Sequence, residues 1–349
     1  MARRAAPWWV LGITATFVAY FAVLVYCDID RPQDYGYHAN FVGSRLVITG
    51  LAPDPRMPAA RAGLLRDDVI VAADGRVIGS AGDWSIIDQN VEFGRPIHLT
   101  VERDGQTVDR PIVLHRADWS YWKTDPGILM LVVLAVQCAA LAVAVVIVLK
   151  RPDDQVALLG AWALATAAVY TIVPPFRFAV VWRALPTGLS AWLLMPFISS
   201  QLVPAVLFTF FASFPRRLIQ SSRVWVAAWA PIAIVAIQPL SHALLTVESP
   251  ARATTPAPSS GPMMAATVGY VLAGLCALVL NYRRLSDPNE RRRVTIVVVG
   301  AIAGLLPGML AIASYQLRSG TPLSGSIFSS GTMRSFCRPA YHWPTSSQL

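Results

Sequence analysis

Apolar residues fall into long runs along most of the chain. Seven of these runs approach or exceed the roughly 20 residues that a helix needs to cross the hydrocarbon core of a bilayer. They cover 8–26, 127–149, 156–173, 191–213, 224–247, 264–281 and 294–317. The run 127–149, GILMLVVLAVQCAALAVAVVIVL, contains one Gln and no charge, which is typical of a transmembrane helix rather than of a buried core helix. The pattern predicts a polytopic α-helical membrane protein with about seven spans.

The stretch between the first two runs follows a different pattern of short segments and turns. RLVITGL (45–51) alternates like a strand, and AARAGL (59–64) is typical of a short helix that ends at a glycine. DDVIVAADG (67–75) predicts a buried strand that ends in an Asp-Gly turn. These features predict a small α+β domain inserted at 31–120.

The second half of this domain has a helix and a hairpin. GDWSIIDQNV (82–91) places apolar residues at helical spacing, with Asp83 as the expected N-cap. Two alternating segments, PIHLTVER and VDRPIVLH, flank Asp104-Gly105, which is a strong signal for a two-residue hairpin turn. The expected order is strand, short helix, strand, longer helix and hairpin.

The charge pattern predicts the topology. The net charge is +9, but most acids lie within 28–125, and the excess of Arg lies in alternate connections between the apolar runs. The positive-inside rule then places the N-terminus in the cytoplasm and 28–125 outside. We therefore expect no nucleic-acid partner, and lipid as the surrounding medium. Arg far outnumbers Lys, which suggests a bacterial source, so the expected location is the inner membrane of a bacterium, as a multi-pass protein.

Residues 35–116 resemble a PDZ domain of the bacterial type. The resemblance rests on Pro58-Ala59-Ala60, Ala62-Gly63-Leu64, Asp68-Val69-Ile70, Asp74-Gly75, Gly94 and Arg103-Asp104-Gly105, although Asp67 stands where the family usually has Gly. Such domains bind peptide or protein C-termini by adding a strand to an exposed sheet edge. The resemblance implies a groove between 41–48 and the helix 83–91, with a carboxylate-binding loop near Gly36-Tyr37. The expected peptide-binding residues are Gly36, Tyr37, Phe41, Val42, Ile87 and Val91. A degenerate PDZ fold that acts as a rigid spacer is the alternative.

The sequence lacks the motifs of the common catalytic and metal sites. No His has the H-E-x-x-H spacing of a zinc protease, and no Walker loop or G-x-G-x-x-G is present. The four cysteines show neither metal-ligand spacing nor a disulfide framework. Ser190 and His242 lack the context of a rhomboid-type pair. We therefore expect no catalytic residue, metal or cofactor.

GAIAGLLPG carries a packing signal in the last apolar run. Gly300, Gly304 and Gly308 recur at every fourth position, which clears one helical face for close approach of another helix. This face is expected to pack either within the chain or between the protomers of a homo-oligomer.

The whole arrangement over 8–317 is similar to the input half of bacterial membrane sensor histidine kinases of the competence or quorum-sensing type. The likeness rests on one N-terminal span (8–26), a PDZ-like domain, a six-helix bundle at 127–317, and the stretches FASFPRRL and NYRRLSDPNERRRVTIVVVGAIAGLLP. It implies a sensor module that lacks its kinase, with a full-length sensor kinase as a further partner. The tail 318–349 is expected to be disordered or aberrant. The alternative function is a PDZ membrane scaffold that tethers extracytoplasmic proteins.

Overall fold

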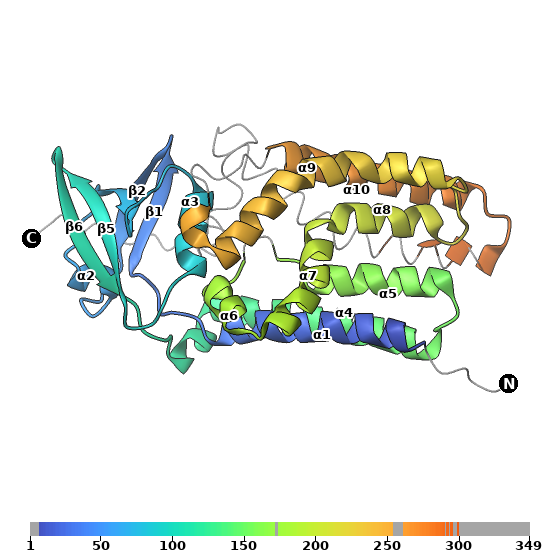
Figure 1. Ribbon diagram of the computed structural model, residues 1–349, viewed down its shortest axis with the longest axis horizontal. Helices are drawn as coiled ribbons and strands as arrows, with labels where there is room; N and C mark the ends of the chain where they lie inside the picture. The colour runs from blue at the N-terminus through green and yellow to red at the C-terminus, as the bar shows by residue number, and fades with distance from the viewer. Residues whose placement is uncertain are drawn as a thin grey trace, which may run out of the picture.

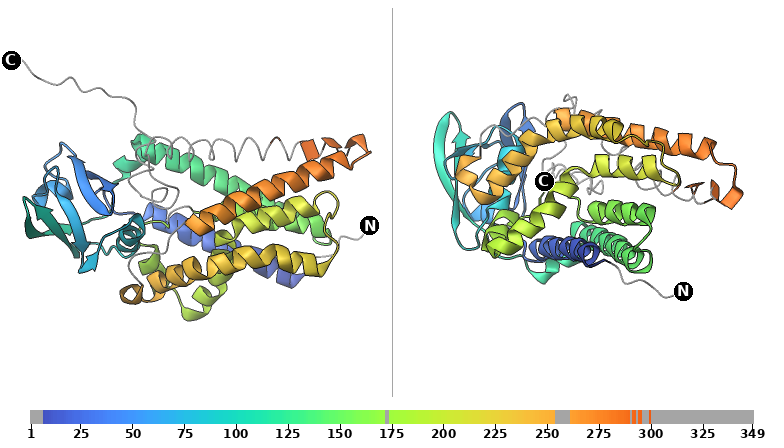
Figure 2. Two further views of the ribbon diagram at one scale, coloured as in Figure 1. Left: turned by 90° about the horizontal axis from the view of Figure 1, so that it is seen from above. Right: turned by 45° about the vertical axis from the view of Figure 1, so that its right-hand side comes forward.

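The computed structural model describes residues 7–171, 174–253, 261–289, 291–292, 294–295 and 299. A small sheet domain lies at one end of the molecule, and the long helices extend away from it (Figure 1). The view from above shows the same separation (Figure 2). The predicted division into an α+β domain and a helical part is thus present in the described residues.

The sheet domain is built from six antiparallel strands. Five of them follow the order β1-β2-β3-β5-β6, and the short β4 pairs with β3. The strands are β1 (Tyr37–Val42), β2 (Arg45–Leu51), β3 (Val69–Ala73), β4 (Arg76–Val77), β5 (Pro96–Arg103) and β6 (Gln106–Val113). Two helices complete the domain, α2 (Pro58–Arg61) and α3 (Ala81–Gln89).

The hairpin predicted at Asp104-Gly105 joins β5 to β6. Both turn residues have positive φ, 50° for Asp104 and 76° for Gly105, as the mirror-image turns of two-residue hairpins require. Alternate strand residues face inward, and Ile48, Ile70 and Leu99 are fully buried in one apolar core.

The start of α3 differs from the expectation that Asp83 is its N-cap. Ser80 has extended backbone angles and caps the helix: its hydroxyl accepts the Asp83 N–H (3.3 Å) and donates to Asp83 Oδ2 (2.6 Å). Asp83 occupies the third helical position, where its carboxylate also accepts the Gly79 N–H (3.3 Å). A serine followed three residues later by an acid is a reciprocal cap, which explains why the helix begins before Asp83.

The helical part contains eight α-helices among the described residues. They are α1 (Trp8–Ile29), α4 (Asp125–Lys150), α5 (Gln155–Ala168), α6 (Phe178–Ala184), α7 (Thr187–Gln201), α8 (Val203–Ser213), α9 (Ser222–Glu248) and α10 (Gly261–Arg283). Short 3₁₀ turns, η1 (Trp119–Lys123) and η2 (Pro250–Arg252), precede α4 and follow α9.

The described residues do not support seven spans or a six-span bundle. By length and apolar composition, α1, α4, α9 and α10 could cross a membrane, which makes four spans, or five if the bent pair α7–α8 counts as one. The run 294–317 lies almost entirely outside the described residues, as do Gly300, Gly304, Gly308 and the tail 318–349.

Two of the expected spans are shorter or broken for identifiable reasons. The helix expected at 156–173 is only 14 residues long, and at about 1.5 Å per residue it falls short of a bilayer core of about 30 Å. The span expected at 191–213 bends by 71° between α7 and α8. Pro204 lies just after the bend, and because it has no N–H it cannot continue the hydrogen-bond ladder of α7.

Aromatic side chains hold α1 against its neighbours near the sheet domain. Tyr20 of α1 contacts Phe178, Trp182 and Phe197, with ring centroids 6.3–6.5 Å apart. Phe17 of the same helix is 1% exposed. These contacts bury one side of α1 and fix the point from which the chain enters the sheet domain.

Candidate peptide-binding groove

The β1 strand leaves its outer edge open among the described residues. It pairs with β2 alone, with Ala39 opposite Ile48 and Phe41 opposite Leu46. Ile48 donates its backbone N–H to Asp68 O (2.8 Å) on the β3 side, so its backbone points away from β1. Ile48 and Ala39 are therefore a non-hydrogen-bonded pair of the antiparallel ladder, in which the backbone groups of both residues point away from each other. The N–H and C=O groups of Ala39 and Phe41 therefore face the open edge.

The helix α3 and the start of β1 meet in an aromatic cluster. The rings of Tyr35, Tyr37 and Trp84 lie with centroids 5.5–6.4 Å apart. The Tyr35 hydroxyl donates to Asp88 Oδ1 (2.9 Å), which ties the segment before β1 to α3. This cluster fixes the distance between the edge strand and the helix.

The residues expected to line the groove take different positions. Tyr37, Ile87 and Val91 are buried in the core of the domain, Val91 beyond the end of α3, and Phe41 packs against that core from β1. Val42 is 64% exposed, beside the β1–β2 turn. The structure thus brings four of these residues to one core, and Val42 lies apart at the tip.

The loop around Gly36 is closed by the chain itself. Gly36 has φ +84°, and a Cβ built on it would lie 2.4 Å from Met57 Cβ. Its N–H donates to Asp34 Oδ1 (2.9 Å), and its carbonyl accepts the Ala52 N–H (2.9 Å). The Gly36 N–H was expected to donate to the terminal carboxylate of a peptide. It instead donates to the carboxylate of Asp34.

Asp34, Tyr35 and Trp84 were missed as site residues by the sequence reasoning. A local signal for Asp34 was present, because an Asp two residues before a Gly is typical of an Asx turn. No local signal indicated that Tyr35 and Trp84 would meet, since they lie 49 positions apart and join only when α3 packs beside β1.

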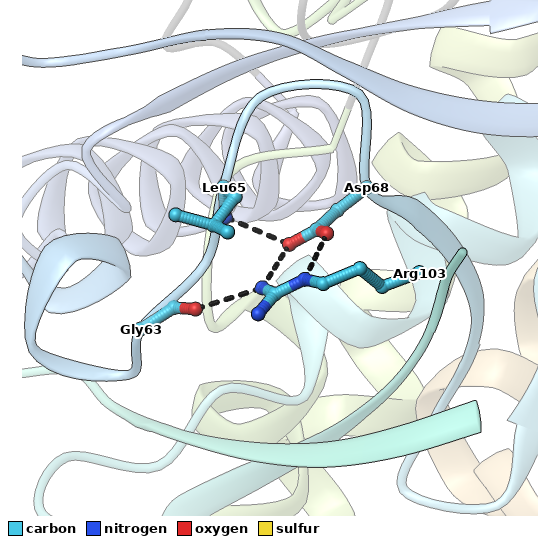
Figure 3. A network of polar contacts seen from close by, with 4 residues as sticks. All are labelled: Gly63, Leu65, Asp68 and Arg103. Carbon is cyan, nitrogen blue, oxygen red and sulfur yellow. Dashed lines mark hydrogen bonds and ion pairs between the residues drawn. The ribbon is translucent and has the colours of Figure 1, made fainter. Parts of the chain in front are cut away.

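A buried ion pair joins the residue before β3 to the last residue of β5 (Figure 3). Arg103 donates to both carboxylate oxygens of Asp68 (2.7 and 2.8 Å) and to Gly63 O (2.9 Å), and the Leu65 N–H donates to Asp68 Oδ2 (2.7 Å). Burial acts to raise the pKa of Asp68, but the hydrogen bonds from Arg103 and Leu65 outweigh it, so this pKa lies below its ordinary value. The network joins β5 to the connection between α2 and β3.

Contacts on the α3 side join the sheet domain to the helices. Arg177, at the start of α6, has φ 63° and donates its backbone N–H to Asp88 O (3.0 Å). Its guanidinium lies 3.7 Å from the Phe93 ring centroid and pairs with Asp30 at the end of α1. Asp30 also pairs with Arg116 (2.7 Å). The helix that borders the groove is therefore attached to both α1 and α6.

Comparison with known families identifies the sheet domain. A family model described as PDZ domain matches residues 51–103. These residues form a PDZ domain. The match runs from the end of β2 to the end of β5 and includes α3 of the PDZ domain, so β1 and the Gly36 loop lie outside it.

Two solved structures of HtrA-type proteases are similar to part of the chain. One is described as HtrA-type protease AlgW with decapeptide, at 25% identity and a TM-score of 0.22, and covers 25% of this chain and 30% of that one. The other is a variant of AlgW with decapeptide, at 23% identity and a TM-score of 0.24, and covers 28% and 34%. The chain thus spans about a third of their length. No curated protein matches the chain.

These comparisons give no support to the resemblance to sensor histidine kinases. A PDZ domain is a module for binding peptides, and its presence leaves open whether the whole chain has an enzymatic activity. That the chain is not an enzyme stays a prediction. Among the described residues, no three His, Cys, Asp or Glu side chains gather as a metal site requires.

Proposed function

We propose that the chain captures an extended segment of a peptide or protein by adding it as a strand to β1. The observation that carries this proposal is the open edge at Ala39 and Phe41, next to α3 in a PDZ domain. Strand addition satisfies backbone groups that otherwise bond only to water, and side-chain pockets add specificity. The aromatic cluster of Tyr35, Tyr37 and Trp84 packs α3 against the start of this edge strand.

The closed Gly36 loop bears on which part of a ligand is bound. A free terminal carboxylate at this loop would meet the carboxylate of Asp34 instead of a free Gly36 amide. Like charges at close range repel, so we expect binding to depend little on a free C-terminus. An internal segment, or a C-terminus whose carboxylate lies elsewhere, is the better match.

We also propose that the PDZ domain is held outside the cytoplasm of a bacterium by helices in the inner membrane. The apolar lengths of α1, α4, α9 and α10 support this placement, and so does the gathering of Arg in alternate connections. Labelling of cysteine variants in intact cells tests it. Ser286→Cys should be unreachable from outside, whereas Ser44→Cys, exposed between β1 and β2 of the PDZ domain, should be labelled.

Hydrogen exchange on the full chain in lipid nanodiscs tests peptide capture. The probes are extended peptides, each with a free or an amidated C-terminus. Binding should protect the amides of β1 and leave those of β6 unchanged, with similar affinity for the two peptide forms. Protection at β6, or no protection at β1 with any peptide, would contradict the proposal.

The attachment of α3 to the helical part favours a second function, as the input of a signalling assembly. Asp88 of α3 contacts both Tyr35, just before β1, and Arg177 at the start of α6. A peptide that shifts α3 would thus act on α6. The same exchange experiment distinguishes the two functions, because signalling requires a change in α6 on peptide binding, and tethering requires none.

A further inference from the structure

A cavity lies within the helical part, far along α1 from the sheet domain. It has a volume of about 390 Å³ and is lined by α1, α4, α5 and α7 together with Arg217, which follows α8. This volume is within the range of roughly 300–1,000 Å³ that is typical of small-ligand sites. The cavity belongs to neither the PDZ domain nor its junction with the helices.

The wall of the cavity is apolar over most of its extent. Phe17 of α1, Val148 of α4 and Trp162 of α5 are examples of its lining side chains. Thr14, which also lines it, donates its hydroxyl to the Val10 carbonyl of its own helix and offers the cavity no free donor. A ligand that fills this space must therefore be largely hydrocarbon.

One end of the cavity is polar and positively charged. Arg217 lines it beside Gln155, and the Arg217 guanidinium donates to Gln155 Oε1 (2.5 Å), a neutral acceptor. Asp154 is the neighbouring acid in sequence, but its Oδ1 accepts the N–H groups of Val156 and Ala157 as the cap of α5. Among the described residues, no carboxylate forms an ion pair with Arg217. The charge is thus left for a ligand.

We infer that this cavity binds a bilayer lipid with an acidic headgroup, with an acyl chain along the apolar wall and the headgroup on Arg217. The inference rests on the membrane placement proposed above, and not on peptide capture. The cavity contacts the beginning of α1, the end of α4 and the beginning of α5, which that placement puts at the cytoplasmic face. Trp9, at its rim, is 51% exposed, as aromatic residues at a membrane interface are. Basic sites between membrane helices bind anionic headgroups for the same electrostatic reason.

Native mass spectrometry of the delipidated full chain tests the site. The protein is given equal amounts of phosphatidylglycerol and phosphatidylethanolamine with identical acyl chains, and no peptide, so the result is independent of the PDZ groove. We expect a preference of about fivefold for the acidic lipid, the effect of one arginine near the surface, which decreases as salt rises. Equal binding of the two lipids would overturn the inference.

Three variants separate this site from general basic attraction. Arg217→Gln should remove the preference, whereas Arg223→Gln, at an exposed arginine that does not line the cavity, should keep it. Ile13 lines the cavity and is 37% exposed, so Ile13→Trp should fold and obstruct the space, with loss of both lipids. An Arg223→Gln effect equal to that of Arg217→Gln, or a lipid-free dimer in place of the lipid complex, would contradict the inference.

Discussion

The two edges of the PDZ sheet differ in what their backbones offer. At the β6 edge, the pair Arg103 and Gln106 flanks a two-residue turn and is hydrogen-bonded, so Thr107, Asp109 and Pro111 face outward. Pro111 has no N–H to offer there. At the β1 edge, Ala39 and Phe41 face outward with both backbone groups intact.

This difference indicates which edge is kept available for docking. A proline and a charged residue on an edge strand are common means of preventing another strand from pairing with it. The β6 edge has both, in Pro111 and Asp109, whereas β1 has neither and lies beside the apolar side of α3. The sheet is thus protected at its β6 edge and open at its β1 edge.

The largest expected effect tests the buried ion pair between Asp68, just before β3, and Arg103, at the end of β5. Asp68→Asn removes the charge partner of Arg103, and the Asp68 side chain is 1% exposed while that of Arg103 is 23% exposed. Breaking such a buried pair leaves an uncompensated charge and costs about 3–5 kcal/mol of unfolding free energy. Urea unfolding of residues 31–120 at pH 7 measures it. Asp67→Asn is the matched control, because the neighbouring Asp67 side chain is 83% exposed and should change stability little.

The same pair predicts a pH dependence with a definite sign. The folded pKa of Asp68 is lower than its unfolded value, which is about 3.9. Its contribution to stability is therefore complete above the unfolded pKa and is lost as the pH falls through the folded one. Asp68→Asn should remove this part of the acid sensitivity. Parallel acid-unfolding curves for wild type and variant would show that another group is responsible.

The second prediction places a proline on β1, at a position equivalent to that of Pro111 on β6. Ala39→Pro removes an outward-facing N–H, and because Ala39 has a small side chain little packing is lost. We expect peptide affinity to fall at least about tenfold, the effect of one lost hydrogen bond of about 1.4 kcal/mol. Thr107→Pro, at an outward-facing position of β6, is the control and should leave affinity unchanged. Titration of both variants in nanodiscs gives the comparison, and equal losses would mean that the edges are not different.

The protected edge could be predicted from the sequence, but the open one could be placed only approximately. Asp104-Gly105 and the alternation on each side of it fix the β5–β6 hairpin, because local backbone preferences and side-chain period determine it. The β1 strand has no comparable signal, and its neighbour α3 reaches it only through long-range contacts of Tyr35 and Trp84.

The helical part shows the same division between local and long-range information. Hydropathy located α1 and α4 to within a few residues, because a long uncharged apolar run has few alternatives to a helix. Within the described residues it predicted more spans than the helices support, because composition does not reveal that the helix after Asp154 has only 14 residues or that a 71° bend precedes Pro204.

The third prediction concerns the hydrogen bond that joins α3 to the segment just before β1. Tyr35→Phe removes the hydroxyl that donates to Asp88 Oδ1, and Asp88 is 5% exposed. A hydrogen bond to a charged group contributes about 1.5–3 kcal/mol, so the free energy of unfolding should fall by about this amount. Urea unfolding measures the change.

The smallest expected effect comes from the surface ion pairs near the two edges. Arg45 of β2, opposite Val42 of β1, pairs at 2.7 Å with Glu102 of β5, and their side chains are 55% and 40% exposed. Water and salt screen such a pair, and holding two long side chains costs entropy, so Glu102→Gln should lower the free energy of unfolding by less than about 0.5 kcal/mol. On the β6 side, His98 Nδ1 and Asp109 Oδ2 are in hydrogen-bond contact at 2.8 Å, and their side chains are 55% and 58% exposed, so Asp109→Asn should be similarly mild. Peptide affinity should change less than about twofold in either variant, since charge screening limits both pairs alike. A tenfold loss in Glu102→Gln alone would mean that charge rather than backbone geometry distinguishes the edges.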